Sequence, residues 1–289
     1  MEDKIVRVRI WVVLVLLLAG LVVWIPEIGK ANFRNPQANL EVHFFDVGQG
    51  DAIFIKTPDG IQVLIDGGPD SSVLRELGSQ MKVFDRNIDL VIATHSDKDH
   101  IGGLIDVLNR YDVKNILLTE NKNATEASDI FSKNTKAENA SIILARRGQV
   151  FQLGASTTLE ILSPAGPTDG WESNNASIIV QLRYGDIEFM LTGDAPYEIE
   201  DYLVSIYGDQ LESEVLKLGH HGSKTSTSEI FLEVVDPEYA VVSSGKDNRY
   251  GHPNKDVIGR TIISGAKIYS TIEAGTISFV SDGREVWLK

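Results

Sequence analysis

Hydrophobic residues follow two different patterns along this chain. Residues 10–25 (IWVVLVLLLAGLVVWI) form one uncharged run with a tryptophan near each end. From Leu40 onward, short apolar segments alternate with polar or Gly-rich turns such as Gly48–Asp51. A continuous apolar run is typical of a membrane segment, whereas short segments between turn residues are typical of a globular domain. The chain therefore divides into an apolar N-terminal segment and a folded remainder.

The pattern after residue 39 predicts a mixed α/β (α+β) domain. Strands are predicted at 40–47, 52–57, 61–65, 88–94, 113–118, 158–162, 177–184, 187–192, 214–218, 239–243, 267–271, 276–280 and 286–288. Helices are predicted at 71–81, 101–111, 196–207, 228–235 and 256–264, with one more inside the polar excursion 119–140. Antiparallel hairpins and strand–helix units are both present. This combination predicts two sheets with helices outside them, in one domain of about 250 residues.

The apolar run predicts a membrane anchor within residues 1–26. It is slightly shorter than the roughly 20 residues that span a bilayer, but flanking basic side chains can extend it by snorkelling. The basic residues that precede it are Lys4, Arg7 and Arg9. They predict a cytoplasmic N-terminus, with the rest of the chain across the membrane. Residues 27–39 are then a linker, and residues 40–289 form an extracytoplasmic domain.

A cleaved signal peptide is the alternative interpretation of the same segment. A basic start, an apolar stretch and a small-x-small sequence at Gly29-Lys30-Ala31 fit that pattern. Cleavage there would remove residues 1–31 and leave a secreted protein. The length of the run and its tryptophans favour the uncleaved anchor.

Composition and charge exclude some classes of function. The chain has 43% hydrophobic and 24% charged residues, which are globular values, and its formal net charge is −14. The first nine residues carry +1, so the remainder carries −15. This acid excess argues against a broad basic groove for nucleic acid. Because the chain has no cysteine, any metal must be held by His, Asp, Glu or backbone groups.

The segment THSDKDH at 94–100 carries the strongest chemical signal. It places two His and two Asp after a predicted buried strand and before a helix. Divalent metals bind imidazole nitrogen and carboxylate oxygen, and strand ends are where α/β sheets present ligands. His95 and Asp97 are expected to share one ion, and Asp99 and His100 a neighbouring one. The alternative is a solvated polar loop in which Asp99 caps the helix.

Two further strand ends carry candidate ligands. Asp194, in LTGDA, is expected to bridge two cations, or else to be a turn or helix-capping residue. His220 and His221 begin HHGS, where one imidazole would be a ligand and the other would be held by a supporting bond.

Other polar residues are less specific. His252 follows a predicted strand after a short loop and is expected to donate a proton or contact substrate, or to be a surface residue. Asp46 and Asp51 flank two glycines and either support the site or make a turn. His43 lies within a predicted strand and is taken as structural.

In this order, these residues resemble the metallo-β-lactamase superfamily. Its HxHxDH signature appears here as HxDxDH at 95–100, with Asp97 in place of the second His. Four motifs together resemble the C-terminal metallo-hydrolase domain of ComEC competence proteins, which take up transforming DNA. They are FDVGQGDA at 45–52, HSDKDH at 95–100, LTGD at 191–194 and HHGS at 220–223. The resemblance covers roughly residues 40–289.

The resemblance implies a four-layer αββα sandwich with the metals at one edge and a metal-held hydroxide as nucleophile. It implies one metal bound by His95, Asp97 and Asp194, and a second bound by Asp99, His100, Asp194 and one of His220/His221. The oxygen-rich ligand set favours Mn²⁺ or Zn²⁺, with Mg²⁺ as a further candidate, and one or two ions in all. Asp99 is the candidate for orienting the nucleophile, and His252 or His220 for protonating the leaving group. The candidate substrate contacts are Asn175, Ser177, Ser223 and Lys224.

Two departures from the family pattern bear on function. No His occurs from residue 101 to residue 219, where the superfamily often supplies one, and Asn174, Asn175 and Ser177 stand in roughly that region. The first metal is therefore expected to be weakly held, completed by water or absent. ComEC proteins also contain a large polytopic channel, whereas this chain has one apolar segment, so we do not expect it to be the channel.

The favoured hypothesis is a membrane-anchored, metal-dependent phosphodiesterase, in particular a nuclease acting on DNA. Its main difficulty is the acidic charge, because phosphate contacts usually dominate nucleic-acid affinity. The basic residues near the motifs, which would form a local patch, are Lys217, Lys224, Lys246 and Arg249.

Two alternatives remain open at this stage. One is a hydrolase of a small ester, thioester or lactone, which would need no basic track. The other is a non-catalytic binding module that keeps the fold but not the chemistry. The sequence does not determine the oligomeric state.

Overall fold

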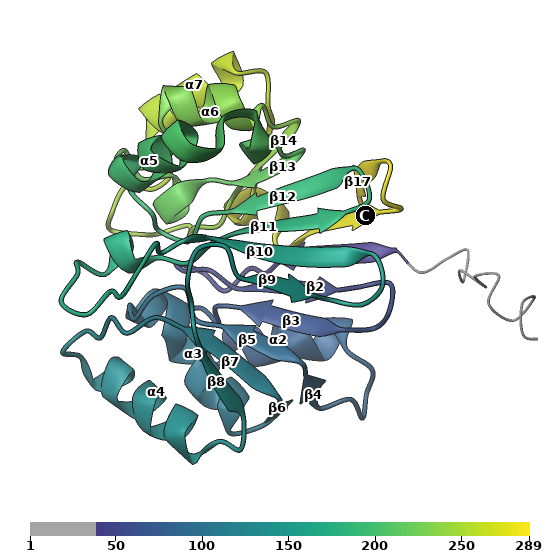
Figure 1. Ribbon diagram of the computed structural model, residues 1–289, viewed down its shortest axis with the longest axis vertical. Coiled ribbons are helices and arrows are strands. Elements are labelled where there is room, and N and C mark those ends of the chain that lie inside the picture. The colour runs from purple at the N-terminus through teal and green to yellow at the C-terminus, as the bar shows by residue number, and fades with distance from the viewer. Residues whose placement is uncertain (1–38) are drawn as a thin grey trace, which may run out of the picture. The chain divides into compact units, whose positions relative to one another are not determined.

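Two β-sheets packed face to face form the centre of the computed structural model, which describes residues 39–289 (Figure 1). Helices cover the outer face of each sheet. The αββα layering predicted from the sequence is confirmed in this part of the chain. The predicted anchor at 1–26 and linker at 27–39 fall, apart from Asn39, outside the described residues. Among residues 39–289, no helix is long and apolar enough to cross a bilayer.

The first sheet has eight strands in the order β17-β16-β1-β2-β3-β5-β7-β8. The strands are β1 (Leu40–Phe44), β2 (Ile53–Lys56), β3 (Gln62–Ile65), β5 (Leu90–Ile92), β7 (Asn115–Leu118), β8 (Ser141–Leu144), β16 (Ile277–Ser281) and β17 (Val286–Leu288). Pairing is antiparallel from β17 to β3 and parallel from β3 to β8. A separate two-stranded sheet joins β4 (Asn87–Ile88) to β6 (Asp112–Val113).

The second sheet has seven strands in the order β15-β14-β13-β12-β11-β10-β9. The strands are β9 (Val150–Gln152), β10 (Thr157–Ser163), β11 (Ile179–Tyr184), β12 (Ile187–Leu191), β13 (Val215–Lys217), β14 (Tyr239–Val242) and β15 (Lys267–Ser270). Pairing is antiparallel from β9 to β12 and parallel from β12 to β15. Each sheet therefore has an antiparallel part and a parallel part.

The helices divide between the two sheets. On the first are α2 (Ser72–Gln80), α3 (Lys98–Leu108) and α4 (Glu126–Ala137), and on the second are α5 (Tyr197–Tyr207), α6 (Glu229–Val235) and α7 (Lys255–Ile263). The short elements are η1 (Asn174–Ala176), η2 (Gly208–Leu211), η3 (Gly219–Gly222) and α8 (Thr271–Ala274). Three apolar clusters fill the spaces between the four layers. The central one joins side chains of both sheets, such as Phe44 and Phe189.

Most of the predicted elements are present, with shifted ends. The exposed edge strands β8 and β9 were not predicted, and the short strands β4 and β6 were anticipated only as the first residues of the strands at 88–94 and 113–118. The helix expected at 101–111 begins earlier, as α3 at Lys98, so Asp99 and His100 lie in its first turn. Asp97, not Asp99, occupies the N-cap position, and its side chain makes no capping bond. Asp194 is likewise not a cap, because Pro196 precedes α5. The capping alternatives for Asp99 and Asp194 are therefore wrong.

The first turns of α3 pack directly against the loop that follows β3. A Cβ on Gly103 would lie 2.0 Å from the carbonyl oxygen of Gly67, and one on Gly102 would lie 2.2 Å from that of Pro69. The Gly67 amide donates to the His100 carbonyl at 2.7 Å. Glycine at these positions lets the helix approach the loop closely, which places His100 beside the end of β3.

Replacing Gly103 by alanine should destabilise the protein although alanine is the better helix former. Backbone atoms that cannot move freely would meet the new methyl group, and overpacking of this kind costs about 1–3 kcal/mol. Gly259 of α7 is the matched control, since a Cβ there meets nothing within 4 Å. Gly259→Ala should leave the free energy of unfolding unchanged or raise it by up to about 1 kcal/mol. Equal denaturation midpoints for Gly103→Ala and the unmodified protein would contradict this account.

Candidate metal centre

Four imidazole rings surround one carboxylate oxygen at the carboxyl ends of the parallel strands. The Oδ2 atom of Asp194 lies 3.3 Å from Nε2 of His100, 3.6 Å from Nε2 of His221, 3.7 Å from Nε2 of His220 and 3.9 Å from Nε2 of His95. His95 and His100 follow β5, Asp194 follows β12, and the other two follow β13. The convergence predicted from the sequence is therefore present.

Hydrogen bonds at Nδ1 fix the orientation of His100 and His221. Nδ1 of His221 lies 3.0 Å from the carbonyl oxygen of Ser243. A carbonyl only accepts, so Nδ1 carries the donated proton and Nε2 is left for another partner. Nδ1 of His100 donates in the same way to Oδ2 of Asp66 at 2.7 Å. Supporting bonds of this kind are typical of metal-binding histidines.

His95 is held through a neighbouring hydroxyl. The Thr94 hydroxyl donates to Oδ2 of Asp66 at 2.7 Å, so its lone pairs face Nδ1 of His95 at 3.0 Å. The amide of Thr94 also donates to Oδ1 of Asp66, at 2.8 Å. Asp66, buried at the end of β3, thus orients His100 directly and His95 through Thr94.

His220 differs from the other three. Its Nδ1 lies 3.4 Å from the amide nitrogen of Asn174 and 3.3 Å from the hydroxyl of Thr225. An amide nitrogen only donates, so Nδ1 of His220 accepts in this contact and Nε2 carries the proton of the neutral ring. The His220 side chain is also 27% exposed, whereas those of His95, His100 and His221 are at most 1% exposed. His220 is therefore the solvent-facing member of the pair.

Backbone strain is concentrated at the ends of these strands. Asp66, His220 and His221 have φ values of 58°, 49° and 56°, in the left-handed region that non-glycine residues rarely adopt. Such residues cost on the order of 1–3 kcal/mol each and persist where the surrounding structure requires them. Here the strain turns both imidazoles of η3 toward Asp194.

Two more carboxylates complete the cluster. Oδ2 of Asp97 lies 3.6 Å from Nε2 of His95, and the Asn123 amide donates to its other oxygen. Oδ2 of Asp99 lies 3.4 Å from Nε2 of His221. Burial opposes ionisation of Asp99, but the close approach of His221 and the charge of His100 outweigh burial and hold the pKa at about 2. Asp99 is therefore an anion at neutral pH.

Carboxylates also control the protonation of the rings. Burial lowers the pKa of His221, but the charges of Asp194 and Asp51 outweigh burial and raise it to about 9. The pKa of His100 is raised well above its usual value, again against burial, by Asp194 and Asp66. Without a metal, both rings are cations at pH 7.

The donor atoms of the cluster meet the chemical requirements of a divalent cation. Within the described chain, Nε2 of His95, His100 and His221 and Oδ1 of Asp194 are buried without a hydrogen-bond partner. Buried polar groups are normally paired, so a convergent set of unpaired ones requires an explanation. The atoms of His95, His100 and Asp194 lie within 4.8 Å of one another, as do those of Asp99, His100 and His221. Nitrogen and carboxylate ligands in such groups suit Zn²⁺ or Mn²⁺.

A buried ion pair between Lys217 and Asp51 lies next to the centre. Nζ of Lys217 lies 2.5 Å from Oδ2 of Asp51, and both side chains are at most 2% exposed. The other oxygen of Asp51 lies 3.3 Å from Nδ1 of His221. Lys217 is thus no part of a surface patch for phosphate, and that expectation was wrong. Of the two roles predicted for Asp46 and Asp51, Asp51 has the supporting one. Asp46 has the other, because its side chain accepts a hydrogen bond from the Gly48 amide in a turn.

The residues predicted to contact substrate occupy different environments. Lys224 is exposed and Asn175 is half-buried. Ser223 is buried and its hydroxyl lies 3.0 Å from that of Thr225. Ser177 is fully buried and accepts from the Asp194 amide at 3.3 Å, so it positions Asp194 and is not placed to contact a substrate.

Of the two remaining histidines, His252 packs against the four-ring cluster, whereas His43 lies away from it in β1. The ring centroid of His252 lies 5.4 Å from that of His220, and burial together with the charges of His220 and His221 lowers its pKa to about 4. His43 lies within β1 and its Nδ1 is 2.8 Å from the Ser278 hydroxyl, consistent with a structural role.

Comparison with known proteins agrees with this geometry. The model of the metallo-beta-lactamase superfamily matches residues 45–246. ComE operon protein 3 of Bacillus subtilis is 31% identical over 256 residues, which are 83% of this chain and 33% of that protein. Competence protein ComA of Neisseria gonorrhoeae is 31% identical over 267 residues, 92% of this chain and 35% of that protein. The chain therefore spans about a third of the length of these relatives.

A solved structure shows the same fold. The metallo-beta-lactamase fold protein YhfI of Bacillus subtilis aligns with a TM-score of 0.58 at 12% identity. The alignment covers 84% of this chain and all of YhfI.

Binding of a divalent cation at pH 7 should release protons. His100 and His221 are protonated there because their pKa values are raised, and a ligand imidazole must be neutral. Affinity for Mn²⁺ should therefore rise between pH 7 and pH 9. Calorimetry in two buffers of different ionisation enthalpy would count the protons, and we expect at least one.

His221→Gln should reduce both the affinity and the number of protons released. Asp209→Asn, on the exposed surface of η2, is the control and should change neither. Binding without proton release would contradict the arrangement described above.

Proposed function

The chain belongs to the metallo-β-lactamase superfamily, and from this premise we propose that its domain is a metal-dependent phosphodiesterase acting on a DNA strand. The observation that carries the proposal is the group of buried, unpaired imidazole nitrogens around Oδ2 of Asp194. The names of the relatives, which concern competence, favour nucleic acid as the substrate.

The residues that would hold metal fall into two sets. His95, Asp97 and Asp194 form the first, and Asp99, His100, His221 and Asp194 form the second. His221 is preferred to His220 because the Ser243 carbonyl accepts from its Nδ1, so that Nε2 is the nitrogen left for a metal once the ring is neutral. Asn174, whose buried Oδ1 has no partner among the described residues, stands where the superfamily often supplies a His to the first set. We favour Mn²⁺ or Zn²⁺, with Mg²⁺ as a further candidate.

A bound dication would polarise a phosphoryl oxygen and favour ionisation of a water molecule. Side chains of the protein would orient the attacking water and protonate the leaving oxygen. Asp99 is held as an anion and can orient an attacking water by accepting its hydrogen bond. His252 is neutral at pH 7 because its pKa is about 4, but an approaching phosphate anion would raise that pKa and allow it to donate to the leaving oxygen. The side chain of Lys224 is exposed to solvent and can contact a phosphate.

We also propose that the domain is anchored to the membrane. The apolar run at 10–25 and the basic residues before it favour an anchor, with the domain on the extracytoplasmic side. A domain there would meet incoming DNA before it reaches the cytoplasm.

The full chain, purified in detergent, should cleave a fluorescently labelled single strand of DNA when Mn²⁺ is added. Asp97→Ala should lower the rate by at least about 100-fold, because it removes a ligand of the first set. Asp209→Ala removes an exposed carboxylate outside the site and should not change the rate. Gel analysis of the products at several times would measure both. Absence of cleavage, or equal cleavage by Asp97→Ala, would contradict the proposal.

Hydrolysis of a small ester, thioester or lactone is the second candidate. The charge of −15 after residue 9 and the exposed apolar side chains of Ile142 and Leu144 near the centre favour it. Chromogenic esters assayed beside the DNA strand, with the same two variants, would separate these functions.

A further inference from the structure

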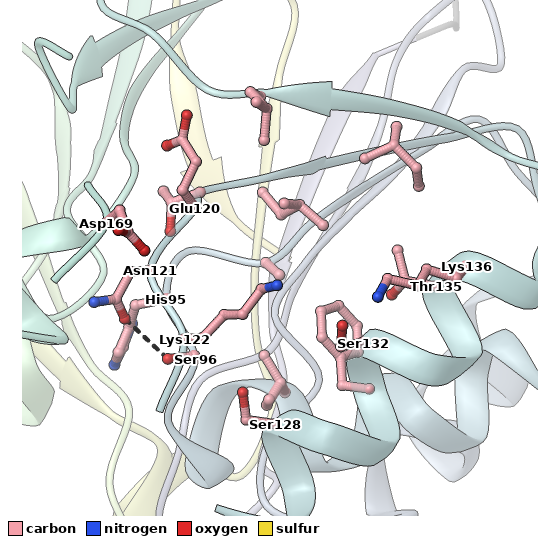
Figure 2. Close-up of a pocket in the computed structure, with 17 residues that line it drawn as sticks. His95, Ser96, Glu120, Asn121, Lys122, Ser128, Ser132, Thr135, Lys136 and Asp169 are labelled. Carbon is pink, nitrogen blue, oxygen red and sulfur yellow. Dashed lines mark hydrogen bonds between the residues drawn. The ribbon is translucent and has the colours of Figure 1, made fainter. Parts of the chain in front are cut away.

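A recess adjoins the metal centre on the side of α4. It has a volume of about 400 Å³, within the range typical of small-molecule sites. Figure 2 shows it between α4 and the neighbouring strands, with His95 and Ser96 in its wall. These residues directly precede Asp97. The recess therefore adjoins the loop that carries the candidate ligands His95 and Asp97.

The floor of the recess is apolar and accessible. Leu118 of β7, Phe131 of α4, and Ile142 and Leu144 of β8 contribute to it. Ile142 and Leu144 are 46% and 42% exposed, and they share one face because side chains alternate along a strand. Exposed apolar side chains gathered in a concave site beside a reactive centre suit the flat, poorly hydrated part of a ligand.

The same recess contains polar groups that an acyl chain would leave unsatisfied. Thr135 is 5% exposed and lines the recess, and its hydroxyl has no hydrogen-bond partner among residues 39–289. Ser128 and Ser132 present further hydroxyls from the same helix. A heterocyclic base offers both a flat apolar face and an edge of donors and acceptors, so it matches this combination of floor and wall.

Two ammonium groups border the recess. Lys122 and Lys136 line it, and neither belongs to a salt bridge of the described residues (Figure 2). Of the two carboxylates that also line it, Glu120 is paired with Arg146, and Asp169 lies away from Lys136 in the view. In a chain with a large acid excess, unpaired lysines beside an apolar recess favour an anionic group on the ligand.

We propose that this recess binds the nucleotide next to the scissile phosphodiester, with its base on the floor formed by Phe131, Ile142 and Leu144 and its phosphate near Lys122. This inference rests on the proposed function and names the part of the substrate that the recess would hold. The base would pack against the apolar floor, the Thr135 hydroxyl would face its edge, and the lysines would contact the phosphate.

The test uses the full chain and calorimetric binding of deoxyadenosine 5′-monophosphate, deoxyadenosine and deoxyribose 5-phosphate. EDTA is present so that phosphate cannot bind a metal ion. The monophosphate should bind more tightly than either fragment. Ile142→Glu places a charge on the floor and should weaken monophosphate binding about tenfold or more. Lys122→Gln should weaken the monophosphate but not deoxyadenosine.

Ile230→Glu is the matched control, because Ile230 is 49% exposed on α6 and does not line the recess. It should not change nucleotide binding, and Mn²⁺ affinity should be the same in all variants. Equal nucleotide affinity of Ile142→Glu and the unmodified chain would overturn the proposal. So would binding of hexanoate in place of the nucleotide.

The failure of this proposal is distinguishable from failure of the proposed function. Cleavage of single-stranded DNA without nucleotide binding would overturn the recess assignment alone. Nucleotide binding that Ile142→Glu removes, in a protein that cleaves no DNA, would support the recess as a nucleotide site and overturn the phosphodiesterase.

Discussion

The structure around the site depends on one shared oxygen atom. Oδ2 of Asp194 lies 3.3–3.9 Å from four imidazole nitrogens, three of them fully buried. Burial disfavours charge on all of these groups, so the arrangement is stable only if carboxylate and imidazole charges compensate one another or a cation replaces the ring protons. The two sheets supply the constraint, because each presents the carboxyl ends of its parallel strands at this place. The two sheets therefore hold the loops that carry the histidines and Asp194 at a fixed distance from one another.

Charge compensation extends beyond the rings themselves. Asp66 accepts from Thr94 and His100, and Asp51 pairs with Lys217 while facing His221. Each carboxylate holds one imidazole ring, so that the ring cannot rotate or change tautomer freely. Removal of one partner would leave a buried charge unpaired, which costs more than an intact buried pair contributes. Asp51 and Asp66 are therefore held in place as firmly as the histidines that they orient.

The sequence predicted the layers and the convergence of His95, His100 and Asp194, because each follows a strand with a strong apolar pattern. It did not predict Asp66 or Thr94 as supports, since their roles depend on contacts across 28 residues or more. Lys217 was misplaced because a lysine in a short strand is normally solvated, and its burial depends on Asp51, which is distant in sequence. The edge strands β8 and β9 have exposed, weakly patterned residues, so local pattern did not identify them.

The acidity of the domain and an anionic substrate are compatible if binding is short-ranged. Surface charges more than about 8 Å away are largely screened at physiological salt, so the total charge matters less than the charges near the reacting bond. Two dications would offset the charges of Asp97, Asp99, Asp194 and Asp66, and Lys122 and Lys136 add positive charge beside them. Such a site can hold one or two phosphates, but it lacks the long basic track that duplex binding uses. The geometry therefore favours a single strand, held near its reacting bond by a base in the recess, over an extended duplex.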